Sequence, residues 1–169
     1  MNDFFKVTNK RLFLKYAFPC GKVLVSRGNI TKEFLDEIKE SIVKNKPLKE
    51  DYIKPFKVAL FFSSDIAKKQ GKKIIDEEVI HKYYLERHDE VVKWRADLKP
   101  DIVVSSCRIK PGKILNTNKD ATVKTPIGTM EVKLDFIPNA KIGDFITVHY
   151  DYGCEIISEE LAKKLWKRF

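Results

Sequence analysis

A cysteine surrounded by basic residues is the first group in this chain that could do chemistry. The segment CRIKPGK places Cys107 close to Arg108, Lys110 and Lys113. Nearby cations favour the thiolate over the thiol, and the thiolate is the form that binds metals. The alternative is ordinary packing, because an unpaired cysteine beside a strand is commonly a small core residue.

A second candidate group lies further along the chain in the segment VHYDYGCEI. It places His149, Asp151 and Cys154 within six residues, immediately after an apolar run. Imidazole, carboxylate and thiolate ligands suit iron or zinc, so this loop could bind a metal ion. The alternatives are a packed histidine and an Asp151 that serves only as a turn residue before Gly153.

The remaining cysteine and histidines give weaker signals. Cys20 lies between Pro19 and Gly21, which is typical of an exposed turn. His81 and His88 are seven positions apart on a predicted helix, about 10 Å along its axis, which is too far to clamp one ion. We therefore expect both histidines at the surface. The three cysteines form no CxxC pair, and the sequence contains no Walker loop, GxGxxG or Ser/His/Asp arrangement, so no enzyme activity is predicted.

The first hundred residues have helical periodicity. Apolar residues recur every three or four positions over 31–46, where Thr31 is the expected N-cap, and over about 54–71 and 76–97. A short helix is expected to end at Pro19, followed by an extended segment to Gly28. These patterns predict a mainly helical domain over residues 1–100.

After Pro100 the period changes to two. Short strands are expected over 102–104, around 109, and over 113–115, 121–123, 130–134 and 145–149, with turn residues between them. A capped amphipathic helix is expected from Ser158 onward. The overall prediction is an α+β chain, with a small β-barrel and a terminal helix over residues 101–169.

Charge and hydropathy limit the classes of function. The net charge is +9, but residues 1–100 hold 22 Lys and Arg against 15 Asp and Glu, whereas residues 101–169 hold 11 against 9. No apolar run is long enough to span a membrane and no secretory signal is evident, so a cytoplasmic location is expected. A basic chain with a small barrel could instead bind RNA, and this is the alternative function that the sequence leaves open.

The second half resembles a known family over residues 107–165. Its segments CRIKPGKIL, ATVKTPIGTMEVKLDFIP, IGDFITVH and SEELAKKL resemble hydrogenase assembly chaperones of the HypC/HupF type. Those proteins open with a cysteine and a Pro-Gly-Lys motif and continue to a Gly-Asp strand that ends in histidine. The spacing of Cys107, Pro111, Gly112, Lys113 and His149 carries the resemblance.

This resemblance implies an OB-like barrel with a terminal helix. It also implies that Cys107 and His149 help to hold and deliver iron carrying cyanide and carbon monoxide, and that Pro111, Gly112 and Lys113 belong to a partner-binding motif. The expected partners are a maturation scaffold protein and the immature large subunit of a nickel–iron hydrogenase.

The internal position of Cys107 modifies that expectation. The family cysteine is N-terminal and has a free amine beside it, whereas 106 residues precede Cys107. An additional ligand would therefore come from Asp151 or Cys154. We predict a composite Cys107–His149–Cys154 site near one end of the barrel, in a non-catalytic protein that assists metallocentre assembly.

Overall fold

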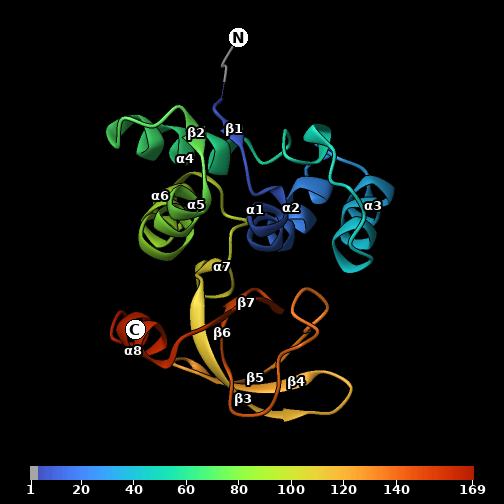
Figure 1. Cartoon of the computed structure of the whole chain (residues 1–169), viewed down its shortest axis with the longest axis vertical. Helices are drawn as coiled ribbons and strands as arrows, with labels where there is room; N and C mark the ends of the chain where they lie inside the picture. Colours follow the sequence, from blue (N-terminus) through green and yellow to red (C-terminus); the bar gives the residue numbers. More distant parts are fainter. Residues whose placement is uncertain (1–3) are drawn as a thin grey trace. The chain divides into compact units, whose positions relative to one another are not determined.

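The structure is a computed structural model, and it describes residues 4–169. The chain divides into two compact units, one that ends at Ile102 and one that spans Val103–Phe169. Each unit is described separately, with the element labels of Figure 1. Within residues 4–169, no helix combines the length and the apolar character that crossing a membrane requires.

The first unit is built from helices and a two-stranded parallel sheet, in which β1 (Lys6–Val7) pairs with β2 (Ile74–Ile75). The helical elements are α1 (Lys10–Ala17), η1 (Phe18–Cys20), α2 (Gly21–Ser26), α3 (Lys32–Val43), η2 (Glu50–Tyr52), α4 (Lys57–Lys69), α5 (Glu77–His81), η3 (Lys82–Arg87) and α6 (His88–Leu98). In Figure 1, α1 lies between α3 and the α5–α6 segment, and it contacts both α3 and α5. It therefore forms the centre of this unit.

Local signals in the sequence explain where the longer helices start. The Thr31 hydroxyl accepts a hydrogen bond from the Phe34 amide, which confirms the predicted N-cap of α3. Asp76 does the same for the Val79 amide at the start of α5. Leu35, Ile38 and Ile42 of α3 then fall on one buried face, as the three-and-four spacing predicts, whereas Val43 at the end of the helix is exposed.

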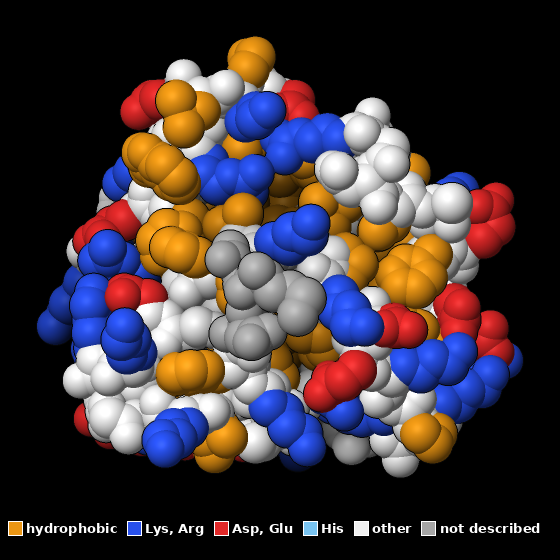
Figure 2. Space-filling model, turned by 90° about the horizontal axis from the view of Figure 1, so that it is seen from above, with side chains coloured by type: hydrophobic (Ala, Val, Ile, Leu, Met, Phe, Trp, Pro, Cys, Tyr) orange, Lys and Arg blue, Asp and Glu red, His pale blue; other side chains and the backbone are white. Residues whose placement is uncertain are grey.

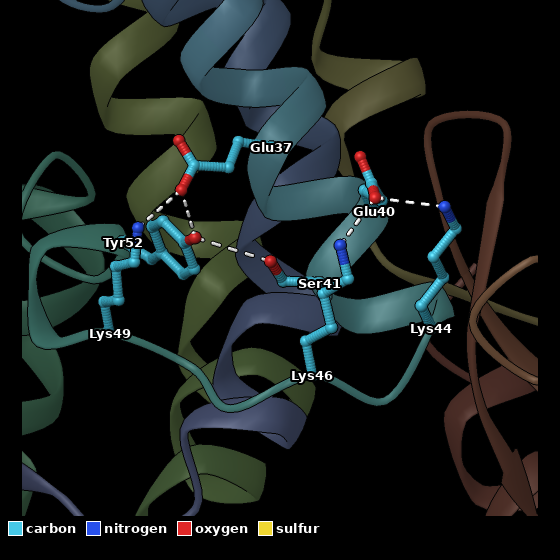
Figure 3. A network of polar contacts seen from close by, with 7 residues as sticks. All are labelled: Glu37, Glu40, Ser41, Lys44, Lys46, Lys49 and Tyr52. Carbon is cyan, nitrogen blue, oxygen red and sulfur yellow. Dashed lines mark hydrogen bonds and ion pairs between the residues drawn. The ribbon is translucent and has the colours of Figure 1, made fainter.

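Ion pairs cover the outer face of α3 (Figure 3). The Glu40 carboxylate accepts hydrogen bonds from the ammonium groups of Lys44 (3.0 Å) and Lys46 (2.6 Å), and Glu37 accepts one from Lys49 (2.7 Å). Hydrogen bonds from Lys46 and Lys44 lower the pKa of Glu40 to about 2. On the face of the molecule drawn in Figure 2, Lys and Arg side chains are scattered among acidic and hydrophobic ones and do not form a continuous stripe.

Two predicted elements of the first unit differ from the observed ones. The segment expected to be extended before Gly28 forms helix α2. The helix expected over 76–97 is interrupted by the π-helical segment η3. A π-helix bonds residue i to i+5 and so changes the phase of the side chains that follow it. His88 follows directly after this segment.

The second unit is a five-stranded antiparallel sheet with a helix at each end of its sequence. Its elements are α7 (Val104–Cys107), β3 (Lys110–Thr117), β4 (Ala121–Thr125), β5 (Gly128–Val132), β6 (Phe145–His149), β7 (Tyr152–Ile157) and α8 (Glu159–Trp166). The strand order is β5-β4-β3-β6-β7. Alternate residues of these strands point inward and form an apolar core around Ile114, Val123, Val132, Ile146 and Val148.

The edges of this sheet approach each other without forming a ladder. Lys133, just after β5, makes an isolated parallel bridge with Tyr152 on β7. The Lys133 amide donates to the Asp151 carbonyl (2.8 Å), and the Gly153 amide donates to the Lys133 carbonyl (2.9 Å). The observed sheet is therefore not a closed barrel.

Three further predictions concern the second unit. The terminal helix is confirmed, and Ser158 caps it by accepting a hydrogen bond from the Leu161 amide. The strand predicted over 102–104 is wrong, because Val104 begins the short helix α7. The loop predicted after His149 is instead a tight turn into strand β7, which carries Cys154.

Candidate metal-binding sites

Cys107 and His149 lie next to each other within the second unit. Cys107 is the last residue of α7 and His149 the last of β6. The Cys107 Sγ is 3.6 Å from the His149 Nε2, although 42 positions separate the two residues. Their side chains are 5 % and 0 % exposed. A thiol and an imidazole held this close can act as two ligands of one transition-metal ion.

Backbone hydrogen bonds hold this pair together. The Tyr150 amide donates to the Ser106 carbonyl (3.1 Å), which fixes the turn after β6 against α7. Tyr150 has a φ of 53°, in the left-handed region that the tight turn between β6 and β7 requires. The Cys107 amide donates to the Val103 carbonyl (3.0 Å) within α7. The positions of both ligands are thus determined mainly by main-chain geometry.

One of the three basic residues near Cys107 in sequence is also close to it in space. Lys110 is 1 % exposed, and its ammonium donates to the carbonyls of Ser106 (3.2 Å) and Arg108 (3.0 Å), the residues on either side of Cys107. The Arg108 guanidinium instead lies over the Phe169 ring, 3.8 Å from its centre. Lys110 is therefore the cation best placed to favour a thiolate at Cys107.

The other two predicted ligands have different surroundings. The Asp151 carboxylate accepts a hydrogen bond from the Lys133 ammonium (2.8 Å). The buried Cys154 thiol donates to the Tyr152 carbonyl of its own strand (3.7 Å). Among residues 4–169, neither side chain joins the Cys107–His149 pair within ligating distance. Their assignment as ligands stays a prediction that substitution can test.

The Pro-Gly-Lys motif lies in strand β3, where its first two residues are buried. Pro111 and Gly112 pair with β6, whereas Lys113 is exposed. A Cβ atom at Gly112 would lie 2.4 Å from the Val123 Cγ1, so close packing explains the glycine. Of these three residues Lys113 is the exposed one, and the partner-binding role of the motif remains a prediction.

A pocket of the second unit is lined by sequence neighbours of Cys107 and His149, although not by these two residues themselves. It has a volume of about 290 Å³ and is lined by Ser105, Ser106, Lys110, Ile127, Met130, Tyr150 and Asp151. Ser106 immediately precedes Cys107, and Tyr150 immediately follows His149. The lining combines hydroxyl, ammonium and carboxylate groups, so the pocket could hold small polar ligands next to the pair.

The first unit contains a second thiol–imidazole pair, which the sequence did not indicate. The Cys20 Sγ and a ring nitrogen of His88 lie within 4.8 Å of each other. His88 is 4 % exposed, so its predicted surface position is wrong, and Cys20 is half-buried rather than exposed. The sequence does hold a signal for this burial, because His88 lies four positions after Tyr84 and three before Val91, on the apolar side of the predicted helix.

Comparison with known proteins adds no family assignment to this geometry. No protein-family model matches the chain, and no curated protein is significantly similar to it.

Proposed function

We propose that this protein binds a divalent transition-metal ion through Cys107 and His149 and delivers it to another protein. The observation that carries this proposal is the 3.6 Å separation between the Cys107 Sγ and the His149 Nε2 in a buried setting. Thiolate and imidazole are ligands for iron and zinc rather than for magnesium or calcium. The protein is proposed to be a carrier and not an enzyme.

An incomplete set of ligands suits a carrier. Two protein ligands leave open positions on an ion that prefers four or more, and these positions can accept small molecules or a ligand of the receiving protein. The pocket beside the pair offers space for such groups, and the Lys110 ammonium on its wall can donate hydrogen bonds to them. A closed four-ligand shell would release its ion much more slowly.

The resemblance of residues 107–165 to hydrogenase assembly chaperones supports a more specific form of this proposal. In that form the five-stranded sheet is the partly open barrel of an OB-like fold, and the cargo is iron carrying cyanide and carbon monoxide. The partners are a maturation scaffold protein and the precursor of a hydrogenase large subunit, and the protein works in the cytoplasm.

Anaerobic loading with ferrous iron tests the metal site. We expect Cys107→Ser and His149→Gln each to weaken iron binding at least about tenfold and to alter the Mössbauer spectrum of the bound iron. Cys154→Ser is the matched control, because it removes a buried thiol from the same unit. Unchanged spectra and affinity in the Cys107 and His149 variants would refute the proposed site, whereas a change in Cys154→Ser would restore the composite site.

The client is tested separately with purified components. We expect the iron-loaded protein to form a complex with a purified hydrogenase large-subunit precursor, and Cys107→Ser to weaken that complex. Lys113→Ala should weaken it as well if the exposed residue of the Pro-Gly-Lys motif contacts the partner. No complex with the precursor would remove the hydrogenase assignment and leave metal binding intact.

A further inference from the structure

We propose that Cys20 and His88 are a second pair of metal ligands, located in the first unit. They are far apart in sequence, yet the sulfur and a ring nitrogen lie within 4.8 Å of each other. This distance lets both atoms approach one ion at ordinary zinc–sulfur and zinc–nitrogen bond lengths after small side-chain shifts. Neither residue belongs to the Cys107–His149 pair, so each pair is tested by its own substitutions.

Aromatic packing holds the two elements of this pair in place. The rings of Tyr16 on α1 and Tyr84 on η3 stack with centroids 5.0 Å apart, and Phe13 meets Tyr84 edge-on at 6.0 Å. Tyr84 also contacts the His88 ring, at 5.7 Å between centroids. The chain that carries Cys20 begins where α1 ends, so these contacts fix Cys20 relative to His88.

The surroundings of the histidine also favour ligation. The Nδ1 atom of His88 is 3.8 Å from the Asp89 carboxylate, which is too far for the hydrogen bond that metal-binding histidines commonly donate to a carboxylate but close enough for an electrostatic interaction. His88 also follows directly on a π-helical segment, an irregularity that is frequent at functional sites. These two features are independent of the distance to Cys20.

The numbers and types of donors indicate the class of metal. The Cys20–His88 pair supplies one sulfur and one nitrogen ligand. That donor set suits zinc and ferrous iron, and it excludes calcium and magnesium, which prefer oxygen.

Titration of the reduced full-length chain with cobalt(II), a spectroscopic substitute for zinc, tests the inference. We expect Cys20→Ser to diminish the thiolate-to-cobalt charge-transfer band, and His88→Gln to weaken cobalt binding at least about tenfold. His81→Gln is the matched control in the same unit and should change neither property. Unaltered band intensity and affinity in both Cys20→Ser and His88→Gln would overturn the inference.

The same titration separates this second pair from the proposed carrier site. If Cys107→Ser and His149→Gln have no effect while the Cys20 and His88 variants do, only the carrier site fails. The opposite pattern overturns only the second pair. If His88→Gln does not fold, as judged by circular dichroism, the half-buried Cys20 is substituted by alanine and the charge-transfer band gives the answer.

Discussion

The two thiol–imidazole pairs have the same chemistry but are positioned in different ways. In the second unit, a hydrogen bond from the Tyr150 amide to the Ser106 carbonyl brings His149 to Cys107. In the first unit, stacked aromatic rings and a π-helical segment bring His88 to Cys20. Both arrangements are tertiary contacts between residues far apart in the chain. The Cys107–His149 pair is nevertheless indicated in the sequence by basic neighbours and family-like spacing, whereas the Cys20–His88 pair has no such signal.

The largest expected effect comes from removing the aromatic support of the first unit. Tyr84→Ala leaves a cavity beside Tyr16 and Phe13, and we expect it to lower the unfolding free energy of this unit by about 3–5 kcal/mol. Urea denaturation followed by the fluorescence of Trp94, in a Trp166→Phe background, measures the change. Trp94 belongs to the first unit and Trp166 to the second.

Phe136→Ala is the matched variant in the second unit. Phe136 is buried and stacks on Tyr152 with centroids 5.0 Å apart, so a loss of similar size is expected there. It should move the unfolding midpoint reported by Trp166 in a Trp94→Phe background. If Tyr84→Ala and Phe136→Ala each shifted the unfolding midpoints reported by Trp94 and Trp166 equally, the two units would unfold as one. Their stabilities could then not be compared separately.

The secondary structure that the sequence predicts correctly depends on residues close together in the chain. Thr31 and Ser158 cap their helices as expected, because a cap needs only a side chain and the amide three positions on. The sequence predicts a loop where strand β7 lies, because Tyr152, Gly153 and Cys154 lack alternation. All three are buried, and a register irregularity between Thr147 and Val148 sits opposite them. A bulge of this kind disrupts the period-two pattern on which strand prediction depends.

Of the two thiol–imidazole pairs, the sequence predicts only the one in the second unit. The basic neighbours and the family-like spacing point to Cys107 and His149, which do lie together. Pro19 and Gly21 predict an exposed turn around Cys20, but both neighbours are buried in the structure. His88 is expected at the surface, but it lies four positions after Tyr84 and three before Val91, which is the spacing of one helix face, and it is buried. The error at Cys20 concerns tertiary packing, whereas the spacing of His88 from these apolar residues already indicates its burial.

Added metal should stabilise both units if both pairs bind it. Zinc at about 100 times its dissociation constant raises the unfolding free energy by about 2.7 kcal/mol, because it binds the folded state selectively. In the Cys20→Ser/His88→Gln variant, we expect zinc no longer to raise the unfolding free energy that Trp94 fluorescence reports. In the Cys107→Ser/His149→Gln variant, we expect the same loss in the unfolding free energy that Trp166 fluorescence reports. Magnesium is the control ion and should give no gain. If zinc changed the unfolding free energy reported by neither Trp94 nor Trp166, neither pair would be a metal site.

Replacing a tightly packed glycine with alanine in each unit should have a smaller effect on stability, for steric reasons. A Cβ at Gly112 would lie 2.4 Å from the Val123 Cγ1, whereas one at Gly21 would lie 2.3 Å from the Leu35 Cδ1. Valine is stiff at χ1, but the end of a leucine side chain can rotate away. We expect Gly112→Ala to cost about 1–3 kcal/mol. Gly21→Ala should cost less, because alanine also favours the helix by about 1 kcal/mol. Equal losses in urea denaturation would show that Leu35 is as immobile as Val123.

The smallest expected effect is the acid titration of the ion pairs on α3. The Glu40 pKa is lowered from 4.5 to about 2 by hydrogen bonds from Lys46 and Lys44, so folding is favoured when Glu40 is charged. That stabilisation is complete above pH 4.5 and is lost as the pH falls toward 2. Glu40→Gln should therefore lower the unfolding free energy only slightly at neutral pH, because the group is exposed and screened by solvent. The difference from the unsubstituted protein should shrink below pH 4.5 and diminish with added salt.

Carboxyl NMR titration gives the direct measurement of this last effect. The Glu40 resonance should titrate near pH 2 in the unsubstituted protein and return toward 4.5 in a Lys44→Gln/Lys46→Gln variant. The metal pairs supply the control, because cobalt or zinc binding should be the same in Glu40→Gln as in the unsubstituted chain. A Glu40 that already titrates near 4.5 would mean that these lysines are solvated rather than paired.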